Sequence, residues 1–186
     1  MIITMTGVPC SGKSSVAAYL EKKYGFEIIK VSQKMREEAK KMGMNILEFN
    51  NYLLQNDLSG QFDKTLDEWT REMGEKRKGD KVIFDSRLAW NFVPESFKVF
   101  IDCSEKTMVE RLKNSDRDSS EKDVKDKAGV NSLMQRVYTE DERYKKIYGL
   151  SYLDKSNYDF VISSDNKTVE QVSEEIYKNY CAFCKS

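Results

Sequence analysis

The stretch GVPCSGKSS, residues 7–15, constrains the fold of this 186-residue chain more than any other. It fits the pattern G-x-x-x-x-G-K-[ST], with fixed positions at Gly7, Gly12, Lys13 and Ser14. The apolar run MIITMT precedes it and the helical pattern VAAYLEKKYG follows it, which predicts a buried strand, a tight turn and a helix. Glycines in such a turn let backbone N–H groups point inward around an anion at the helix N-terminus. The sequence therefore predicts a phosphate-binding loop.

This loop supplies the first candidate site residues. Lys13 would reach the terminal phosphates of a nucleoside triphosphate, and the Ser14 hydroxyl would ligate Mg²⁺. The alternative is a glycine-rich turn with an incidental lysine, which the flanking strand and helix disfavour. The predicted ATP-binding residues are Gly7, Val8, Pro9, Cys10, Ser11, Gly12, Lys13, Ser14 and Ser15.

Short apolar runs rich in β-forming residues recur along the chain, and helical patterns separate them. Their sequences are MIITMT, FEIIKV, KVIFD, FKVFID and YDFVI. Strands that alternate with helices predict an α/β fold with a mostly parallel sheet covered by helices on both faces. The length suits one domain, residues 1–186, with insertions. Two connections exceed a simple crossover: residues 32–79 read as three helices, and residues 104–157 are densely charged and mostly helical.

Composition excludes several classes of protein. Lys plus Arg number 31, as do Asp plus Glu, so no net charge attracts a polyanion, and a general nucleic-acid binder is disfavoured. The chain has no histidine, which excludes Ser-His and Cys-His nucleophiles and histidine-ligated metals. No stretch approaches the roughly 20 apolar residues of a membrane span. The four cysteines are scattered, which fits a reducing compartment, so we expect a cytoplasmic protein with no membrane partner.

A magnesium site needs a carboxylate besides Ser14, and the ends of two predicted strands offer one each. KVIFDSR supplies Asp85 and KVFIDC supplies Asp102. We favour Asp85, because the adjacent Arg87 places a second phosphate-directed group at the same sheet edge. Asp102 is better explained as a cap for a helix that begins near Ser104.

A further cluster of charges lies in QRVYTEDERYKKIYG. Arg136, Glu140 and Arg143 fall at i, i+4 and i+7, on one face of a single helix. Two arginines held apart by a glutamate would make a fork that binds phosphate. The alternative, at about even odds, is an ordinary solvated salt-bridge ladder.

A phosphate-binding loop alone does not separate a kinase from a GTPase or an ATP-driven motor. Guanine-specific GTPases carry an [NT]-K-x-D segment after a strand, and here Val169 stands where the aspartate belongs. Motor ATPases are generally larger and carry further motifs that this chain lacks. A kinase for a small molecule is favoured.

At this point the sequence resembles the cytidylate kinases, in particular the compact archaeal type within the nucleoside monophosphate kinases. The resemblance covers most of the chain. It includes the loop at 7–15, VSQKMREEAKKMGMNILEF after the second strand, DSRLAW after the third, the spacing of Arg136, Glu140 and Arg143, and RYKKIYGLSYLDKSNYDFVISSDNKTVEQVSEEI.

The resemblance implies a five-stranded parallel core of the P-loop kinase type. The insertion at about 32–79 would bind the monophosphate, and residues of about 113–136 would form a lid over ATP. The family pattern implies that Ser32, Arg36 and Arg87 face the monophosphate and that Asp85 lies beside it. It also implies that Arg136 and Arg143 bridge the phosphates, with Glu140 fixing the two arginines. Arg117 would approach ATP from the lid, and residues 163–167 would lie along the adenine.

The expected reaction is ATP with CMP, or dCMP, giving ADP and CDP, or dCDP, in a protein that is a monomer like the family's small members. Two residues depart from the family pattern. Cys10 replaces the usual glycine, and Leu88 replaces an acidic residue that helps read the cytosine amino group in bacterial members. The alternatives are a kinase for AMP, UMP or a non-nucleotide, and a non-transferring ATP-dependent regulatory or assembly factor.

Overall fold

The computed structural model describes residues 1–56, 60–114 and 127–185. Its strands are β1 (Ile3–Gly7), β2 (Glu27–Lys30), β3 (Val82–Asp85), β4 (Phe97–Asp102) and β5 (Phe160–Ser163). Its helices are α1 (Lys13–Tyr24), α2 (Val31–Lys41), α3 (Ile46–Asn56), α4 (Gln61–Lys76), α5 (Ala89–Phe92), α6 (Glu105–Lys113), α7 (Lys127–Tyr148) and α8 (Val169–Phe183), with a 3-10 turn at Lys155–Asn157.

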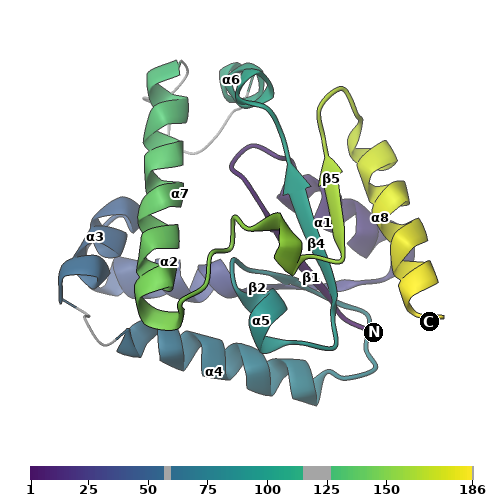
Figure 1. The fold of residues 1–186 in the computed structure, drawn as a ribbon, viewed down its shortest axis with the longest axis horizontal. Helices are drawn as coiled ribbons and strands as arrows, with labels where there is room; N and C mark the ends of the chain where they lie inside the picture. The colour runs from purple at the N-terminus through teal and green to yellow at the C-terminus, as the bar shows by residue number, and fades with distance from the viewer. Residues whose placement is uncertain (57–59, 115–126, 186) are drawn as a thin grey trace.

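The described strands form one five-stranded sheet in the order β2-β3-β1-β4-β5, and every pairing is parallel (Figure 1). Ile3 of β1 is in register with Ile83 of β3 and Phe97 of β4. Because all strands run the same way, their carboxyl ends meet at one edge of the sheet. The predicted fold class is confirmed, and each predicted apolar run overlaps one strand.

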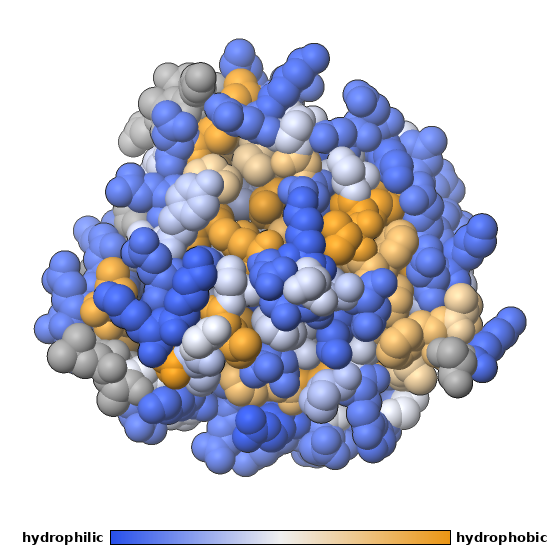
Figure 2. All heavy atoms as spheres, in the orientation of Figure 1, coloured by the Kyte–Doolittle hydropathy of each residue, from blue (hydrophilic) through white to orange (hydrophobic). Residues whose placement is uncertain are grey.

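Alternate residues of the central strands face opposite layers of helix. Ile3 and Met5 pack with Leu20 of α1 and Ile176 of α8 on one face. Val82 and Phe84 pack on the other face with residues of α4 and α5. Both layers are visible in Figure 1, where α8 lies beside α1, and α4 and α5 lie together away from them. In the same view, Figure 2 shows mostly hydrophilic residues around the outline of the molecule.

The long connections are helical where the structure describes them. The first holds α2, α3 and α4, in agreement with the helices predicted at 32–79, and the second holds α6 and α7. Helix α7 lies across the cluster formed by α2, α3 and α4 (Figure 1). In the described ranges, no helix is both long and apolar enough to cross a membrane.

We predict that Leu20→Ala lowers the free energy of unfolding by about 2–5 kcal/mol, because the Leu20 side chain is fully buried between the sheet and α8. Urea unfolding followed by far-UV circular dichroism measures the change. Glu21→Ala, at the exposed neighbouring position, is the control and should change stability by less than about 0.5 kcal/mol. Equal losses in the two variants would contradict this packing.

Candidate active site

The loop between β1 and α1 depends on two glycines for different reasons. A Cβ on Gly7 would lie 2.4 Å from the carbonyl oxygen of Ile101, so a side chain there would collide with β4. Gly12 has φ of 86°, in the left-handed region, and leads directly into α1. The backbone thus turns sharply at the N-terminus of α1, where the helix dipole favours an anion.

Cys10 occupies the position where related loops usually carry glycine, and the structure gives a reason for that preference. Its φ is 61°, a left-handed conformation that strains any residue with a Cβ. The Cys10 side chain is nevertheless buried against Cys103, Met108 and Leu112. This apolar packing offsets part of the strain, so the departure from glycine is compatible with the loop.

Lys13 and Asp85 form an ion pair at the carboxyl ends of β1 and β3. Burial lowers the pKa of the Lys13 ammonium, and the neighbouring guanidinium of Arg87 acts in the same direction. A bound polyphosphate would stabilise the charged form of this lysine. Ser14 follows Lys13 in the first turn of α1 and lines the same cavity as Asp85.

Two cavities meet at this edge of the sheet. The first, of about 440 Å³, is lined by loop residues from Val8 to Ser15 together with residues of α2 and α7 and Arg87, which follows β3. The second, of about 210 Å³, lies between the sheet edge and α2, α4 and α7. We call them the loop cavity and the inner cavity. The residues lining both are Lys13, Ser14, Arg36, Arg87 and Arg136.

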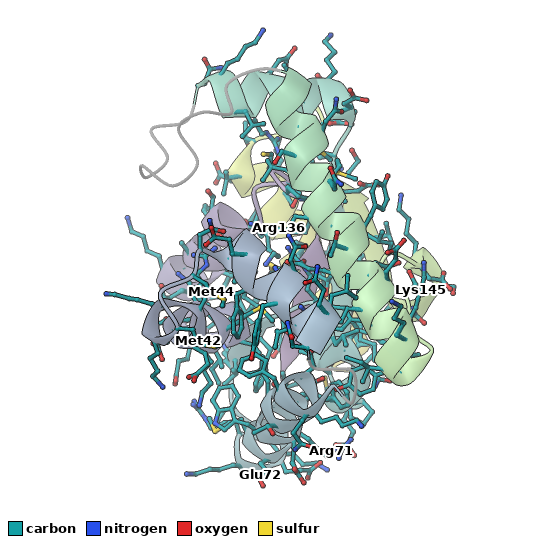
Figure 3. All side chains as sticks on the ribbon, turned by 90° about the vertical axis from the view of Figure 1, so that its left-hand side faces the viewer. Met42, Met44, Arg71, Glu72, Arg136 and Lys145 are labelled. Carbon is teal, nitrogen blue, oxygen red and sulfur yellow. The ribbon has the colours of Figure 1, made fainter. Side chains whose placement is uncertain are left out.

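A buried carboxylate holds two of these cations. Glu140 Oε2 accepts from Nε of Arg87 at 3.1 Å, and Glu140 Oε1 lies 3.4 Å from Nε of Arg136. Burial opposes ionisation of Glu140, but the two guanidinium groups hold its pKa below the ordinary value. Figure 3 shows Arg136 on the side of α7 that faces the helices of the first insertion. The side chain of Glu140 is only 7% exposed, so the solvated ladder is the wrong interpretation.

Arg143 does not complete the fork that the helical spacing predicted. Its Nε lies 2.9 Å from Oδ2 of Asp63, and one NH group donates to Oδ1 of Asn50 at 2.7 Å. Asn50 also donates to Oε1 of Glu140 at 3.3 Å. Arg143 is therefore held between α3 and α4 and does not line either cavity. A direct phosphate contact of Arg143 has no support in this geometry and stays a prediction.

Of the other predicted residues, Ser32 and Arg36 line the inner cavity from α2. Arg117 lies outside the described residues, as does much of the expected lid at 113–136. The expectation for Asp102 is wrong. Ser104 itself caps α6 by accepting from the Thr107 N–H, whereas Asp102 accepts from Lys155 at 2.5 Å and from the Cys103 N–H.

Arg111 of α6 supports the loop, a role that no motif or spacing in the sequence indicates. It donates to the Cys10 carbonyl at 2.8 Å and to the Ser164 hydroxyl and carbonyl, each at 2.9 Å. Arg111 therefore ties the phosphate-binding loop to residues 163–167, the segment expected to lie along adenine.

Sequence reasoning also missed Asp63 and Asp67, which lie four residues apart on α4 and both line the inner cavity. Burial raises the pKa of Asp67 to about 7, and the nearby Asp63 carboxylate acts in the same direction. The Tyr148 hydroxyl, Arg143 and Arg71 oppose this shift. The i, i+4 spacing could have placed both acids on one face, but only the fold shows that this face is buried.

We predict that Arg143→Met lowers the free energy of unfolding by about 3–5 kcal/mol, because it leaves Asp63 buried without its ion-pair partner. Adding Asp63→Leu should restore most of the loss, as both charges are then removed. The control is Lys146→Met at an exposed position of α7, which should change the free energy of unfolding by less than about 0.5 kcal/mol. A double variant no more stable than Arg143→Met would argue against the pair.

Asp67 gives a prediction for pH. Its folded-state pKa of about 7 exceeds the ordinary value of 3.8, so its contribution to stability is present at acidic pH and is lost as pH rises through 7. Asn does not titrate, so Asp67→Asn does not lose stability in this way. The free energy of unfolding of the variant minus that of the wild type, measured by urea unfolding, should therefore increase between pH 5 and pH 8 by more than about 1.4 kcal/mol, the equivalent of one pKa unit. The same difference at both pH values would contradict the shifted pKa.

Known proteins are similar to this chain in sequence and in fold. Residues 3–143 match a family model described as an AAA domain. A cytidylate kinase of Methanocella arvoryzae is 32% identical over 178 residues, covering 96% of this chain and 95% of that protein. A cytidylate kinase of Methanocaldococcus jannaschii is 31% identical, covering 92% and 93%. A solved shikimate kinase from Bacteroides thetaiotaomicron has a TM-score of 0.61 at 12% identity, covering 96% of this chain and 97% of that one, which shows a P-loop kinase fold. Identity above 30% over nearly the full length of two relatives shows that this chain belongs to the cytidylate kinase family.

Proposed function

We propose that the protein transfers the γ-phosphoryl group of ATP to CMP or dCMP, giving ADP and CDP or dCDP. The observation that carries this proposal is that the loop cavity and the inner cavity share one cationic wall, which holds Lys13 and three arginines. Two phosphate-bearing molecules bound in these cavities would meet at that wall. Family membership supports the choice of nucleotide, since the two relatives described above are cytidylate kinases.

The loop cavity would hold the triphosphate of ATP. Backbone N–H groups of the loop and the N-terminus of α1 would bind the phosphates, and Lys13 would exchange Asp85 for the transferred group. Ser14 and Asp85 offer hard oxygen ligands in one cavity, which fits Mg²⁺ that takes its other ligands from phosphate and water. Bound Mg²⁺ would neutralise charge on the phosphates. Residues 163–167, tied to the loop through Arg111, would lie along the adenine.

The inner cavity would hold the monophosphate of the acceptor. An ionised acceptor oxygen attacks the γ-phosphorus in line, and the bond from that phosphorus to the β–γ bridging oxygen breaks as the new P–O bond forms. No proton need leave the acceptor, so the lack of histidine does not hinder this reaction. Arg36, Arg87 and Arg136 would neutralise charge, while Glu140 orients the last two.

The remaining expectations stay predictions. Closure of a lid at about 113–136, with Arg117 approaching ATP, would exclude water and limit hydrolysis. Bridging of phosphates by Arg143 would require it to leave Asp63. We further expect a cytoplasmic monomer whose partners are these small molecules.

The test is coupled ADP release from ATP and Mg²⁺ with CMP, dCMP, UMP, AMP and GMP offered separately. We expect CMP or dCMP to give the highest kcat/KM. Preference for another monophosphate would identify a different kinase on this scaffold. Tight ATP binding without any monophosphate-dependent ADP release would favour the regulatory or assembly factor and overturn the proposal.

We predict that Lys13→Ala lowers kcat with CMP by roughly 10³-fold or more, because the lysine stabilises charge on the transferring phosphoryl group. The coupled assay measures this loss, and isothermal titration with ADP reports binding separately. Lys22→Ala, an exposed lysine on the same helix, is the matched control and should retain wild-type turnover. Turnover of Lys13→Ala within tenfold of wild type would refute the role.

A further inference from the structure

The two ends of the inner cavity differ in chemistry. At the end that borders the loop cavity, Lys13, Arg36, Arg87 and Arg136 supply positive charge. The rest of its lining includes the apolar side chains of Ile46, Leu66 and Leu88, the aromatic side chain of Tyr144, and the carboxylates of Asp63 and Asp67. A molecule with an anionic group and a flat, partly apolar group would therefore bind in one orientation, with the anion at the cationic wall.

The two carboxylates in this lining have different partners. Asp63 forms the ion pair with Arg143, so its charge is already balanced inside the protein. Asp67 forms no ion pair with any residue in the described part of the chain. The Tyr148 hydroxyl donates to its Oδ2 at 2.5 Å, and the structure gives Oδ1 no donor among the described residues.

Asp67 is also costly to keep ionised where it lies. The residue is 8% exposed, and burial together with Asp63 raises its pKa to about 7. Oδ1 of Asp67 is not fully enclosed by the protein, so a donor on a molecule bound in the cavity can reach it. Leu88, which is 1% exposed in the same lining, has no side-chain polar atom to serve as one. A ligand that brings an N–H group to Asp67 would supply the missing donor.

We propose that Asp67 selects the base of the acceptor by accepting a hydrogen bond from the exocyclic amino group of cytosine, with Tyr148 holding the carboxylate in position. This inference rests on the proposed function. Cytosine presents an N–H₂ donor where uracil presents a carbonyl oxygen. An ionised carboxylate accepts from the first and repels the second, so Asp67 favours CMP both by attraction and by exclusion of UMP.

The first experiment compares CMP and UMP in wild type and in Asp67→Asn. The asparagine amide can donate to the uracil carbonyl, so we expect the ratio of kcat/KM for CMP over UMP to fall at least tenfold. The KM for ATP should stay within twofold. Glu68→Gln removes the same charge at the adjacent, exposed position of α4 and should keep the wild-type ratio. A wild-type ratio in a folded Asp67→Asn protein would overturn the inference.

A second experiment removes the amino group from the substrate instead of the carboxylate from the protein. The monophosphate of the 2-pyrimidinone riboside lacks the amino group and keeps the ring and the phosphate. We expect wild type to discriminate CMP from this analogue at least tenfold and Asp67→Asn to discriminate much less, which is the coupling expected of a direct contact. Equal discrimination by both proteins would show that Asp67 does not touch the amino group.

These experiments separate the two proposals. If wild type releases no ADP with CMP, the proposed function fails, whatever Asp67 does. If wild type phosphorylates CMP and the variants leave base preference unchanged, only the role of Asp67 fails. Should Asp67→Asn not fold, Tyr148→Phe releases the carboxylate without removing its charge, and it should weaken the CMP preference while leaving turnover at saturating CMP largely intact. An unchanged CMP preference in Tyr148→Phe, together with wild-type discrimination of less than tenfold against the analogue, would overturn the inference.

Discussion

The buried carboxylate of Glu140 is the interaction on which the site depends. It lies among guanidinium groups from two elements far apart in sequence, Arg87 after β3 and Arg136 on α7. Without it, two cations would be held side by side in a half-buried wall, where their repulsion is weakly screened. Through Asn50 the same carboxylate is linked to α3, so the wall and the helical insertion share one hydrogen-bonded network.

This network also explains why the wall stays open to ligands. Glu140 neutralises only part of the positive charge, since Lys13, Arg36, Arg87 and Arg136 line both cavities. Arg143 lines neither cavity and pairs with Asp63 within the protein. Lys13 is also paired, with Asp85, but it lines both cavities. Access to the cavities therefore separates the cations that phosphate can reach from the one that holds the fold together.

The sequence predicted the loop, the strands and the parallel sheet well, because each rests on a local pattern: the glycine spacing, the apolar runs and their alternation with helices. The arginine fork was predicted only in part. Arg136, Glu140 and Arg143 do share a helical face, but positions seven residues apart are separated by about 10 Å along the axis. Arg143 therefore reaches α3 and α4, while Arg87, from another element, takes its place beside Glu140. Such pairings across elements leave no trace in spacing along the chain.

Asp63 and Asp67 show the same limit more sharply. In sequence they look like the charged face of a solvated helix, and their spacing is equal to that of many exposed pairs. The fold buries both and gives Arg143 to one alone. Asp67 has no cation as a partner among the described residues, and burial makes its ionised form costly. A molecule that brings both a donor for this carboxylate and an anion for the cationic wall would satisfy both parts of the cavity. A nucleotide with an amino group on its base has both features, so the same arrangement that destabilises the empty site favours the occupied one.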